Sequence, residues 1–364
     1  MVILLSNKFN NLTKDLEMHE KKRIAVFGAG GIGGVVGGML SKGGHDVTLI
    51  DTWYEHVSEI QKNGLEVTNQ DEVHLCKPNA IHLNKLQEIK EKFDIGIIAV
   101  KSYDTEWVTH ALKNYVKDDG YFVDFQNGIN DLKVAEIVGK EKTLGCVILI
   151  SAMATEPGKA WRTDSRPDAA YKIGELTGGI TDRLKEFVNI MQSVGVSEYT
   201  EELISERWSK LMINCMVNPL AGLTGWGTAE VRSKPLTQDI AIQVAAEVVK
   251  VAKSEGYSMG KIAGLDPNDF IDAADGKKNV EEIKSQMLEQ ARQAGSASRP
   301  SFGQDVLKKR RTEIDYLTGF VSQVGKKNNI STPFCDKVTE VVNSLGVGFE
   351  PSDENLAEIE KLLD

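Results

Sequence analysis

Lys210, Asn214 and Asn218 recur at four-residue intervals in the mostly apolar segment Trp208–Pro219. A helix over this segment would bring the three polar side chains into one stripe. A largely buried ammonium group and two buried amides need partners, because unpaired polar groups in a core are costly. A small polar substrate would supply those partners, so the stripe is a candidate chemical site. The alternatives are a lysine that extends its ammonium to solvent, and an asparagine at 218 that ends the helix before Pro219.

The distribution of histidines restricts the acids and bases that the second half of the chain can use. All six histidines precede residue 111. A proton donor or acceptor from the later part of the chain must therefore be Lys, Glu, Asp, Tyr or Cys. This distribution argues against a Ser-His-Asp site in the order of the common hydrolases and against a His-rich metal site there. We expect no metal.

Glu313 is a second candidate from the later part of the chain. It follows the segment Ser301–Val306 and is expected within a long amphipathic helix over 303–327. In such a helix, a carboxylate is commonly a solvated charge or the partner of an arginine. The residues alone leave those interpretations open.

A glycine-rich turn near residue 30 is typical of a dinucleotide-binding unit. The sequence Gly28-Ala29-Gly30-Gly31-Ile32-Gly33 fits the G-x-G-x-x-G pattern and lies between the apolar strand Arg23–Phe27 and a small-residue helix. The first glycine allows a tight turn, the second lets the backbone approach a pyrophosphate, and the third lets the helix pack on the strand. The helix N-terminus adds N–H donors and a positive dipole end. The alternative is a plain structural turn.

Asp51 ends the next predicted strand, Asp46–Asp51, where an acidic side chain can hold ribose hydroxyls. A carboxylate at this place repels a 2′-phosphate, and Thr52, Trp53 and Tyr54 offer no cation in exchange. These residues favour NAD over NADP as the cofactor. If Asp51 only caps the turn that follows, the preference stays open.

Polar residues also follow two later strand candidates. Lys101 comes directly after the strand Phe93–Val100, and Asn127 comes after the strand Tyr121–Phe125. Ligands of open α/β sheets bind at the carboxyl ends of the strands. We therefore expect Lys101 and Asn127 to line the cofactor crevice. The alternative is that Asn127-Gly128 forms an ordinary turn.

Strands and helices alternate up to about residue 200, which predicts a parallel sheet covered on both faces. Leu144–Ala152 is a further strand, 64–83 an inserted hairpin and 158–176 an antiparallel extension. After about residue 200 helical periods dominate, with loops around one helix between Gly256 and Ser301. The expected helices are 203–222, 236–255, 279–293, 303–327 and 332–345.

This pattern predicts a fold with an α/β Rossmann-type N-terminal domain followed by an all-α C-terminal domain. The expected parts are an N-terminal extension over 1–22, a dinucleotide-binding domain over 23–199, and a helical substrate and catalytic domain over 200–364.

Composition excludes several classes of protein. The formal net charge of −10 disfavours a nucleic-acid binder, and the basic run Lys308–Arg311 is expected to be a solvated helix face. The four cysteines show no C-x-x-C spacing, so a reducing cytoplasm fits better than a disulfide framework. No apolar run approaches a membrane span, so we expect no membrane partner. A homodimer is compatible with a long helical second half.

The chain resembles the ketopantoate reductase (2-dehydropantoate 2-reductase) family over roughly residues 22–345. The matching motifs are the glycine fingerprint, Val100-Lys101-Ser102, Gln126-Asn127-Gly128, Lys210-x-x-x-Asn214-x-x-x-Asn218-Pro219, and Ser301 with Glu313 twelve residues later. The resemblance implies a Rossmann domain followed by a helical domain of the 6-phosphogluconate dehydrogenase C-terminal type, with the cleft between them. The chain differs from the usual family pattern at Asp51. The family often has a basic residue at this place and uses NADPH. Thr228 stands where some members place a further Asn.

The resemblance further implies a role for each candidate. Lys210 would be the general acid, and Glu313 the carboxylate that orients the substrate or the lysine. Three residues would bind the 2-oxo or 2-hydroxy acid, namely Asn214, Asn218 and Ser301. Lys101 and Asn127 would line the junction of cofactor and substrate, with Asn127 contacting both.

The residues themselves also fit the reduction of a ketone, without reference to the family. Hydride delivery to a ketone carbon creates an alkoxide, which needs a proton and a nearby positive charge. The Lys210 ammonium supplies both, and burial would lower its pKa toward neutrality. We therefore expect NAD(P)-dependent reduction of a 2-oxo acid to a 2-hydroxy acid. The alternatives are an NAD-dependent 2-hydroxy acid dehydrogenase for another branched or aromatic acid, which Trp226 would suit, and a non-catalytic NAD-binding regulator.

Overall fold

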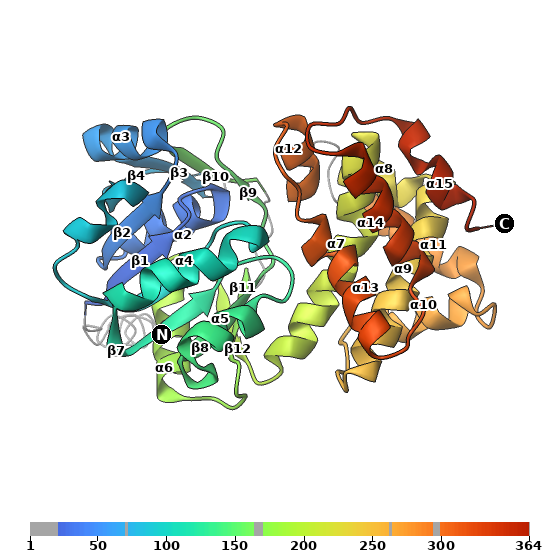
Figure 1. Ribbon diagram of the computed structural model, residues 1–364, viewed down its shortest axis with the longest axis horizontal. Coiled ribbons are helices and arrows are strands. Elements are labelled where there is room, and N and C mark those ends of the chain that lie inside the picture. The colour runs from blue at the N-terminus through green and yellow to red at the C-terminus, as the bar shows by residue number, and fades with distance from the viewer. Residues whose placement is uncertain (1–20, 70–71, 164–169, 262–263, 294–298, 364) are drawn as a thin grey trace, which may run out of the picture.

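The computed structural model describes residues 21–69, 72–163, 170–261, 264–293 and 299–363. The predicted N-terminal extension over 1–22 lies outside the described residues except for Lys21 and Lys22. The two halves of the chain lie side by side, with the α/β part carrying the N-terminal elements and the helical part the C-terminal ones (Figure 1). The prediction of an α/β domain followed by an all-α domain is confirmed.

The main sheet has the strand order β12-β11-β8-β7-β6-β1-β2-β5 among the described residues. Neighbouring strands are parallel except for β11, which runs antiparallel to β8. Of the antiparallel extension predicted over 158–176, β11 forms the last part, and 164–169 lie outside the described residues. The strands are β1 (Arg23–Phe27), β2 (Asp46–Asp51), β5 (Asn79–His82), β6 (Phe93–Ile98), β7 (Val116–Asp124), β8 (Thr143–Ile148), β11 (Tyr171–Glu175) and β12 (Ser197–Thr200). The interior residues of β1, β2 and β8 are buried and mostly apolar, as expected of strands covered on both faces.

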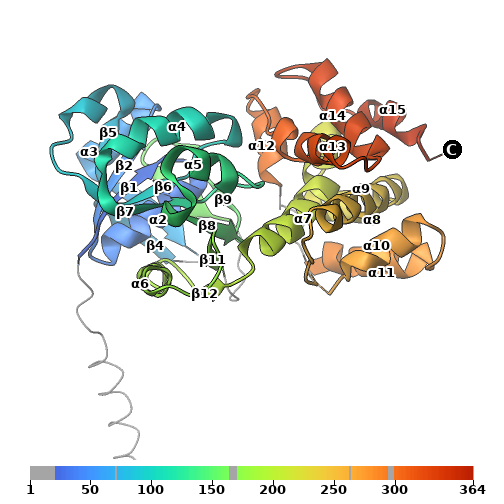
Figure 2. The ribbon, with the colours of Figure 1, turned by 60° about the horizontal axis from the view of Figure 1, so that its bottom comes forward.

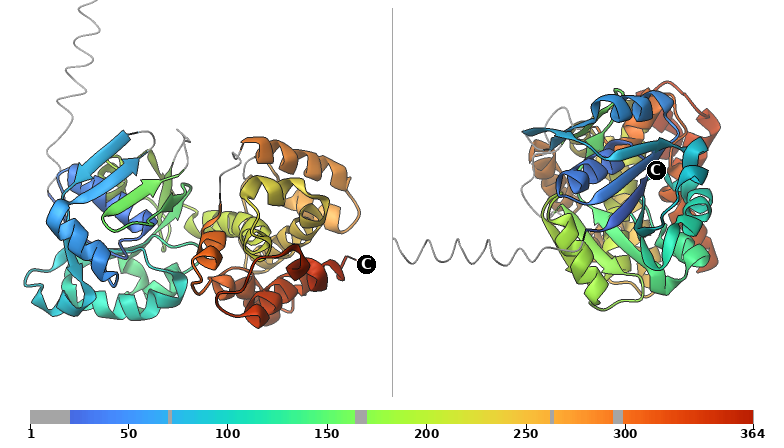
Figure 3. Two further views of the ribbon diagram at one scale, coloured as in Figure 1. Left: turned by 90° about the horizontal axis from the view of Figure 1, so that it is seen from above. Right: turned by 90° about the vertical axis from the view of Figure 1, so that its left-hand side faces the viewer.

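Helices cover both faces of this sheet. Side chains of α2 (Gly31–Lys42) and α6 (Asp182–Met191) belong to one apolar core, and side chains of α4 (Thr105–Leu112) and α5 (Asp131–Val138) belong to another. Helix α3 (Tyr54–Asn63) packs beside β5 at the edge of the sheet. Figure 3 shows the sheet and its helices from two further directions.

A second, smaller sheet has the order β4-β3-β10-β9. The predicted hairpin in 64–83 is present as β3 (Leu65–Asn69) and β4 (Glu72–Cys76), which pair antiparallel. Its last part instead forms β5, which joins the main sheet. Strand β10 (Lys159–Arg162) pairs with β3 and with the short β9 (Ala152–Met153). This sheet packs against α2.

The helical half is built around two long helices, α7 (Leu203–Thr224) and α9 (Pro235–Ser254), which pack on each other. Figure 2 shows α7 extending from the α/β half into the helical half. The surrounding helices are α8 (Thr228–Ser233), α10 (Pro267–Ala274), α11 (Val280–Gln293), α12 (Ser301–Leu307), α13 (Thr318–Lys327), α14 (Pro333–Leu345) and α15 (Ala357–Glu360). No helix of the described residues is long and apolar enough to span a membrane.

The structure differs from the predicted helices in several places, among them the short helices α8 and α15, which were not predicted. The predicted helix 303–327 is wrong as one element, because α12 ends at Leu307 and α13 begins only at Thr318. Lys309 takes the left-handed conformation with φ 53°, and the N–H groups of Lys309 and Arg310 donate to Val306 O and Asp305 O. This is the Schellman arrangement that ends a helix. A further difference is α10, which lies where loops around one helix were expected, although the Asp266 side chain caps this helix and a proline begins it.

The end of α12 changes the setting of two predicted features. Lys308–Arg311 lie in the loop after the helix, so the prediction that they form a helix face is wrong. Glu313 is likewise outside α-helix, directly before a short 3₁₀ turn, Ile314–Tyr316.

Glu247 on α9 gives the fold a pH-dependent contribution. Its carboxylate accepts the N–H groups of Phe334 and Cys335, each at 2.8 Å, and so caps α14. Burial raises the pKa of Glu247 from 4.5 to about 7, and the two N–H donors only partly oppose this. Between pH 4.5 and about 7, Glu247 in the folded protein holds a proton that the same group in the unfolded chain has released. The free energy of unfolding therefore falls as the pH rises through this range.

We expect Glu247→Gln to flatten this dependence, removing up to about 3 kcal/mol of the change in unfolding free energy between pH 5 and 8. Denaturant unfolding at both pH values would measure it. The control is Glu340→Gln, an exposed position on α14, which should keep the wild-type slope. An unchanged slope in Glu247→Gln would contradict the assignment.

Candidate functional site

The glycine-rich turn joins β1 to α2 at the carboxyl edge of the main sheet. Gly28 has φ +99°, and a Cβ there would lie 2.7 Å from Ala99 O on the neighbouring β6 segment. A Cβ on Gly33 would overlap Gly28 O. Both glycines are therefore required by the close packing of helix and strand.

Gly30 differs from its neighbours because its position is open. It is exposed, and a Cβ there would have no heavy atom within 4 Å. It is also the N-cap of α2, which has no side-chain cap among the described residues. The first N–H groups of a helix lack partners within the helix, so they can donate to an anion. The space and the donors fit the pyrophosphate of a dinucleotide.

Asp51 connects the end of β2 to the glycine-rich turn. Its Oδ2 accepts the N–H of Ala29 at 2.6 Å, and its Oδ1 accepts the N–H of Trp53 at 2.8 Å. The second contact is the turn cap considered as the alternative at this position. Each carboxylate oxygen can accept more than one hydrogen bond, so the side chain can still receive ribose hydroxyls.

His56 supports the same turn and was not singled out from the sequence. Its buried ring accepts the N–H of Gly158 at Nδ1 (3.0 Å), so the neutral ring carries its proton on Nε2 and donates to Ala29 O (3.0 Å). The ring stacks on Trp53. Burial lowers the pKa of His56, although the charge of Asp51 opposes this. No local sequence signal distinguishes this histidine, because both contacts are distant in the chain.

Lys101 meets two carboxylates from the helical half. Its ammonium pairs with Asp305 on α12 and with Glu313 Oε2 at 3.0 Å. Glu313 Oε1 also accepts the N–H and the hydroxyl of Ser102, at 2.9 and 2.8 Å. Burial lowers the pKa of Lys101, but Glu313 and Asp305 outweigh it and hold this pKa above its usual value. Burial raises the pKa of Glu313, but Lys101 and Ser102 outweigh it and keep this pKa below its usual value.

Asp305 is the part of this cluster that sequence reasoning missed. Burial raises its pKa, and the charge of Lys101 opposes the rise. Ser301, a predicted substrate residue, begins α12 and is partly exposed. It lies four residues before Asp305, so the two share one helix face. Ser301 is thereby on the side of α12 that turns toward Lys101.

Asn127 joins the cluster to α7. Its Oδ1 accepts the Asn214 amide at 3.4 Å, and its backbone carbonyl accepts the side chains of Asn130 and Ser102 at 2.8 and 3.2 Å. Two predicted site residues from opposite halves of the chain are thus in contact.

Lys210 and Asn218 complete the polar stripe on α7, and both are partly exposed. The helix continues past Pro219 to Thr224, so Asn218 does not end it and that alternative is wrong. Trp226 follows α7, packs against the helical core and has the Lys234 ammonium 4.0 Å from its ring centroid. Lys210 and Thr224 are fourteen positions apart on α7, a rise of about 21 Å, so Trp226 is remote from Lys210.

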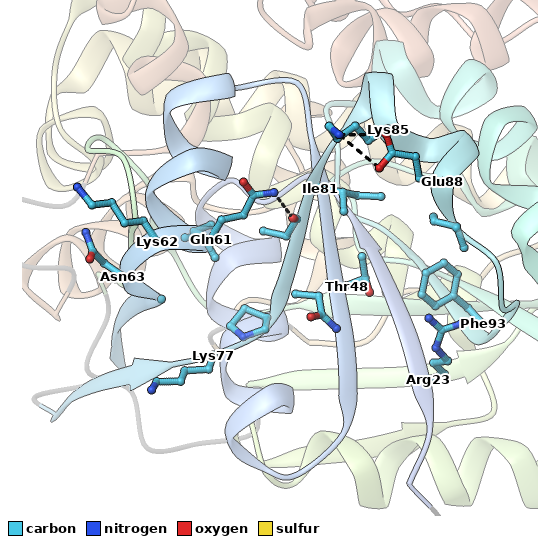
Figure 4. Close-up of a pocket in the computed structure, with 16 residues that line it drawn as sticks. Arg23, Thr48, Gln61, Lys62, Asn63, Lys77, Ile81, Lys85, Glu88 and Phe93 are labelled. Carbon is cyan, nitrogen blue, oxygen red and sulfur yellow. Dashed lines mark hydrogen bonds and ion pairs between the residues drawn. The ribbon is translucent and has the colours of Figure 1, made fainter.

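A large pocket lies elsewhere. It measures 610 Å³ and is lined by Arg23, Thr48, Gln61, Lys77, Lys85 and Phe93, among others (Figure 4). Arg23 and Phe93 begin β1 and β6, whereas the glycine-rich turn follows the end of β1. The residues that line the pocket include no member of the cluster around Lys101. The described residues contain no group of three or more His, Cys, Asp or Glu side chains that could hold a metal ion.

Two family models match this chain in succession. The model for ketopantoate reductase PanE/ApbA matches residues 24–178, and the model for ketopantoate reductase PanE/ApbA C terminal matches residues 202–346. The chain belongs to the ketopantoate reductase family. The sequence resemblance to this family, and the expectation of an oxidoreductase, are confirmed at the level of the family.

Curated relatives include members of the ketopantoate reductase family. The 2-dehydropantoate 2-reductase of Lactococcus lactis subsp. lactis is 28% identical over 325 residues, which cover 88% of this chain and 97% of that protein. The 2-dehydropantoate 2-reductase of Pyrococcus horikoshii is 28% identical over 313 residues, covering 85% and 93%. A solved D-mandelate dehydrogenase with NADH and anilino(oxo)acetate is 23% identical, with a TM-score of 0.74 over 88% of this chain and 97% of that one, which shows a shared fold.

Proposed function

We propose that this member of the ketopantoate reductase family reduces a 2-oxo acid, with ketopantoate as the leading candidate, to its 2-hydroxy acid using a reduced nicotinamide dinucleotide. The contact between Asn127 and Asn214 carries the proposal. It brings the polar stripe of α7 against the loop after β7, at the sheet edge where dinucleotides bind. The proposed substrate groups therefore face the proposed cofactor groups.

The two lysines of this region have different chemical roles in the proposal. Lys101 is held by two carboxylates that raise its pKa, so it remains a charged ammonium and is a poor proton donor. Its charge instead fixes Glu313 and Asp305 at the junction of the two halves. Lys210 is then the proton donor for the alkoxide, and Asn214, Asn218 and Ser301 bind the carboxylate and hydroxyl groups of the substrate.

The cofactor site is built from the open position at Gly30, the N-terminus of α2 and Asp51. When bound, the nicotinamide ring supplies the hydride. The helix N-terminus would hold the pyrophosphate, and Asp51 the adenosine ribose.

Steady-state assays with NADH and NADPH against ketopantoate and a panel of branched and aromatic 2-oxo acids test the proposal. We expect turnover of at least one 2-oxo acid, with ketopantoate the best substrate. Preferential turnover of an aromatic acid would favour the 2-hydroxy acid dehydrogenase. Binding of cofactor without turnover of any acid would favour the regulator and reject the proposal.

Asp51 makes NAD the proposed cofactor. We expect Asp51→Asn to shift the ratio of kcat/KM for NADH over NADPH toward NADPH by about tenfold, because the charge that repels a 2′-phosphate is removed. The control is Asp46→Asn at the opposite end of β2, where the carboxylate pairs with Arg23. A wild-type preference for NADPH, unchanged by Asp51→Asn, would contradict this cofactor assignment.

A further inference from the structure

A buried arginine joins the two halves of the molecule beside the proposed site. Arg207 lies in the first turns of α7, and its side chain is 2% exposed. Nη2 donates to Asp124 Oδ2 at 3.0 Å and to Asp131 Oδ1 at 2.8 Å. Both carboxylates are fully buried, at the end of β7 and the start of α5. A cation of the helical half thus pairs with two carboxyl groups of the α/β half, and burial raises the pKa of Asp124 well above its usual value although Arg207 opposes this.

The same guanidinium also binds the backbone next to Asn127. Nη1 donates to Gln126 O at 2.7 Å, and Nη2 donates to Asp124 O at 3.0 Å. These carbonyls belong to the end of β7 and to the loop that presents Asn127. Arg207 therefore fixes the path of that loop as well as the position of α7.

The spacing on α7 relates this anchor to the proton donor. Lys210 and Asn214 follow Arg207 by three and seven residues, so the three side chains lie within about 60° on one helix face. Arg207 binds Gln126 O, and Asn214 binds Asn127 Oδ1. Lys210 thus lies on α7 between two residues that both hold the 126–127 loop.

We propose that Arg207 is a positioning residue, which sets the distance between Lys210 and the Asn127 loop through Asp124, Asp131 and Gln126. This inference rests on the proposed function, because Lys210 must act on a substrate held against that loop. A planar guanidinium can bind two carboxylates and two carbonyls at once, whereas an ammonium cannot reproduce that geometry. Displacement of a reacting group by about 1 Å can cost about 100-fold in rate.

The test compares Arg207→Lys with Arg183→Lys. Arg183 offers a control, because its Nε also pairs with a buried carboxylate, Glu175, at 2.8 Å, but Glu175 lies opposite Leu144 near the start of β8, away from the carboxyl edge of the sheet. We expect Arg207→Lys to lower kcat by about 30-fold or more, with the Kd for NADH and the KM for the 2-oxo acid within about threefold of wild type. We also expect the acidic or the basic limb of the pH–rate profile to be shifted in Arg207→Lys relative to the wild type. Arg183→Lys should lower Tm comparably and leave kcat and the profile unchanged.

A structural readout separates this inference from the proposed function. Hydrogen exchange of amides 125–130 and the rate of Lys210 acylation, followed by mass spectrometry, should both rise in Arg207→Lys and not in Arg183→Lys. If the wild type turns over no 2-oxo acid, the proposed function fails and these two measurements alone decide the positioning role. An unchanged kcat with unchanged exchange, or an equal loss of kcat in both variants, would overturn it.

Discussion

Replacing Lys210 by alanine is expected to lower kcat for the 2-oxo acid by about 10²–10⁴-fold, the range for loss of a general acid. The Kd for NADH should stay within about twofold, because the glycine-rich turn and Asp51 lie in the other half of the chain. Stopped-flow or steady-state kinetics would give kcat, and fluorescence quenching or titration calorimetry would give the Kd for NADH. The effect is large because the alkoxide would otherwise have to take its proton from water.

Two comparisons make this result specific to the ammonium group. Lys253→Ala, at an exposed position on α9, should leave both constants unchanged. Added methylamine should restore part of the activity of Lys210→Ala if the variant lacks a proton donor rather than a folded site. Undiminished turnover in Lys210→Ala would remove this lysine from the mechanism and return Lys101 to consideration.

Replacing Gly30 by alanine is expected to weaken NADH binding by about 100-fold, equivalent to about 2.7 kcal/mol. The reason is that the added methyl group would enter the open space at the start of α2, where the cofactor pyrophosphate is proposed to lie. The folded protein has room for it, since no heavy atom lies within 4 Å of that position. The free energy of unfolding should therefore change by no more than about 1 kcal/mol, the scale of an N-cap substitution.

Separate measurements of binding and stability test this prediction. Gly260→Ala is a matched control, since a Cβ there also meets nothing within 4 Å and the position is outside the proposed cofactor site. Gly33→Ala should instead destabilise the fold itself, because the added Cβ would overlap Gly28 O. Unimpaired NADH binding by Gly30→Ala would show that the pyrophosphate lies elsewhere.

The parts of the fold predictable from sequence are those set by local patterns. Alternating strands and helices, the glycine-rich turn and the polar stripe on α7 all follow from residue spacing within short windows. The continuous helix over 303–327 was wrong because Leu307, Ile314 and Val321 keep a seven-residue spacing across the polar stretch 308–313, within which the left-handed backbone of Lys309 ends α12. Hydrophobic period alone does not report such a stop when the residue at that place is not glycine.

The less predictable parts of the site depend on contacts between distant segments. Lys101 and Glu313 were both singled out, but their pairing joins residues that lie 212 positions apart. Asp305, His56 and Arg207 were missed because each acts through partners far along the chain. A buried charge becomes recognisable only when its counter-charge is known, and the sequence does not show which distant group that is.

The buried group around Arg207 has a consequence for how this chain acquires its structure. The visible division into two halves does not define two independent folding units, because the counter-ion for Asp124 and Asp131 is carried by the helical segment. A nucleotide-binding half released without α7 would keep these two buried carboxyl groups without their cation, a costly state. Assembly of the first half is therefore thermodynamically coupled to the arrival of the second.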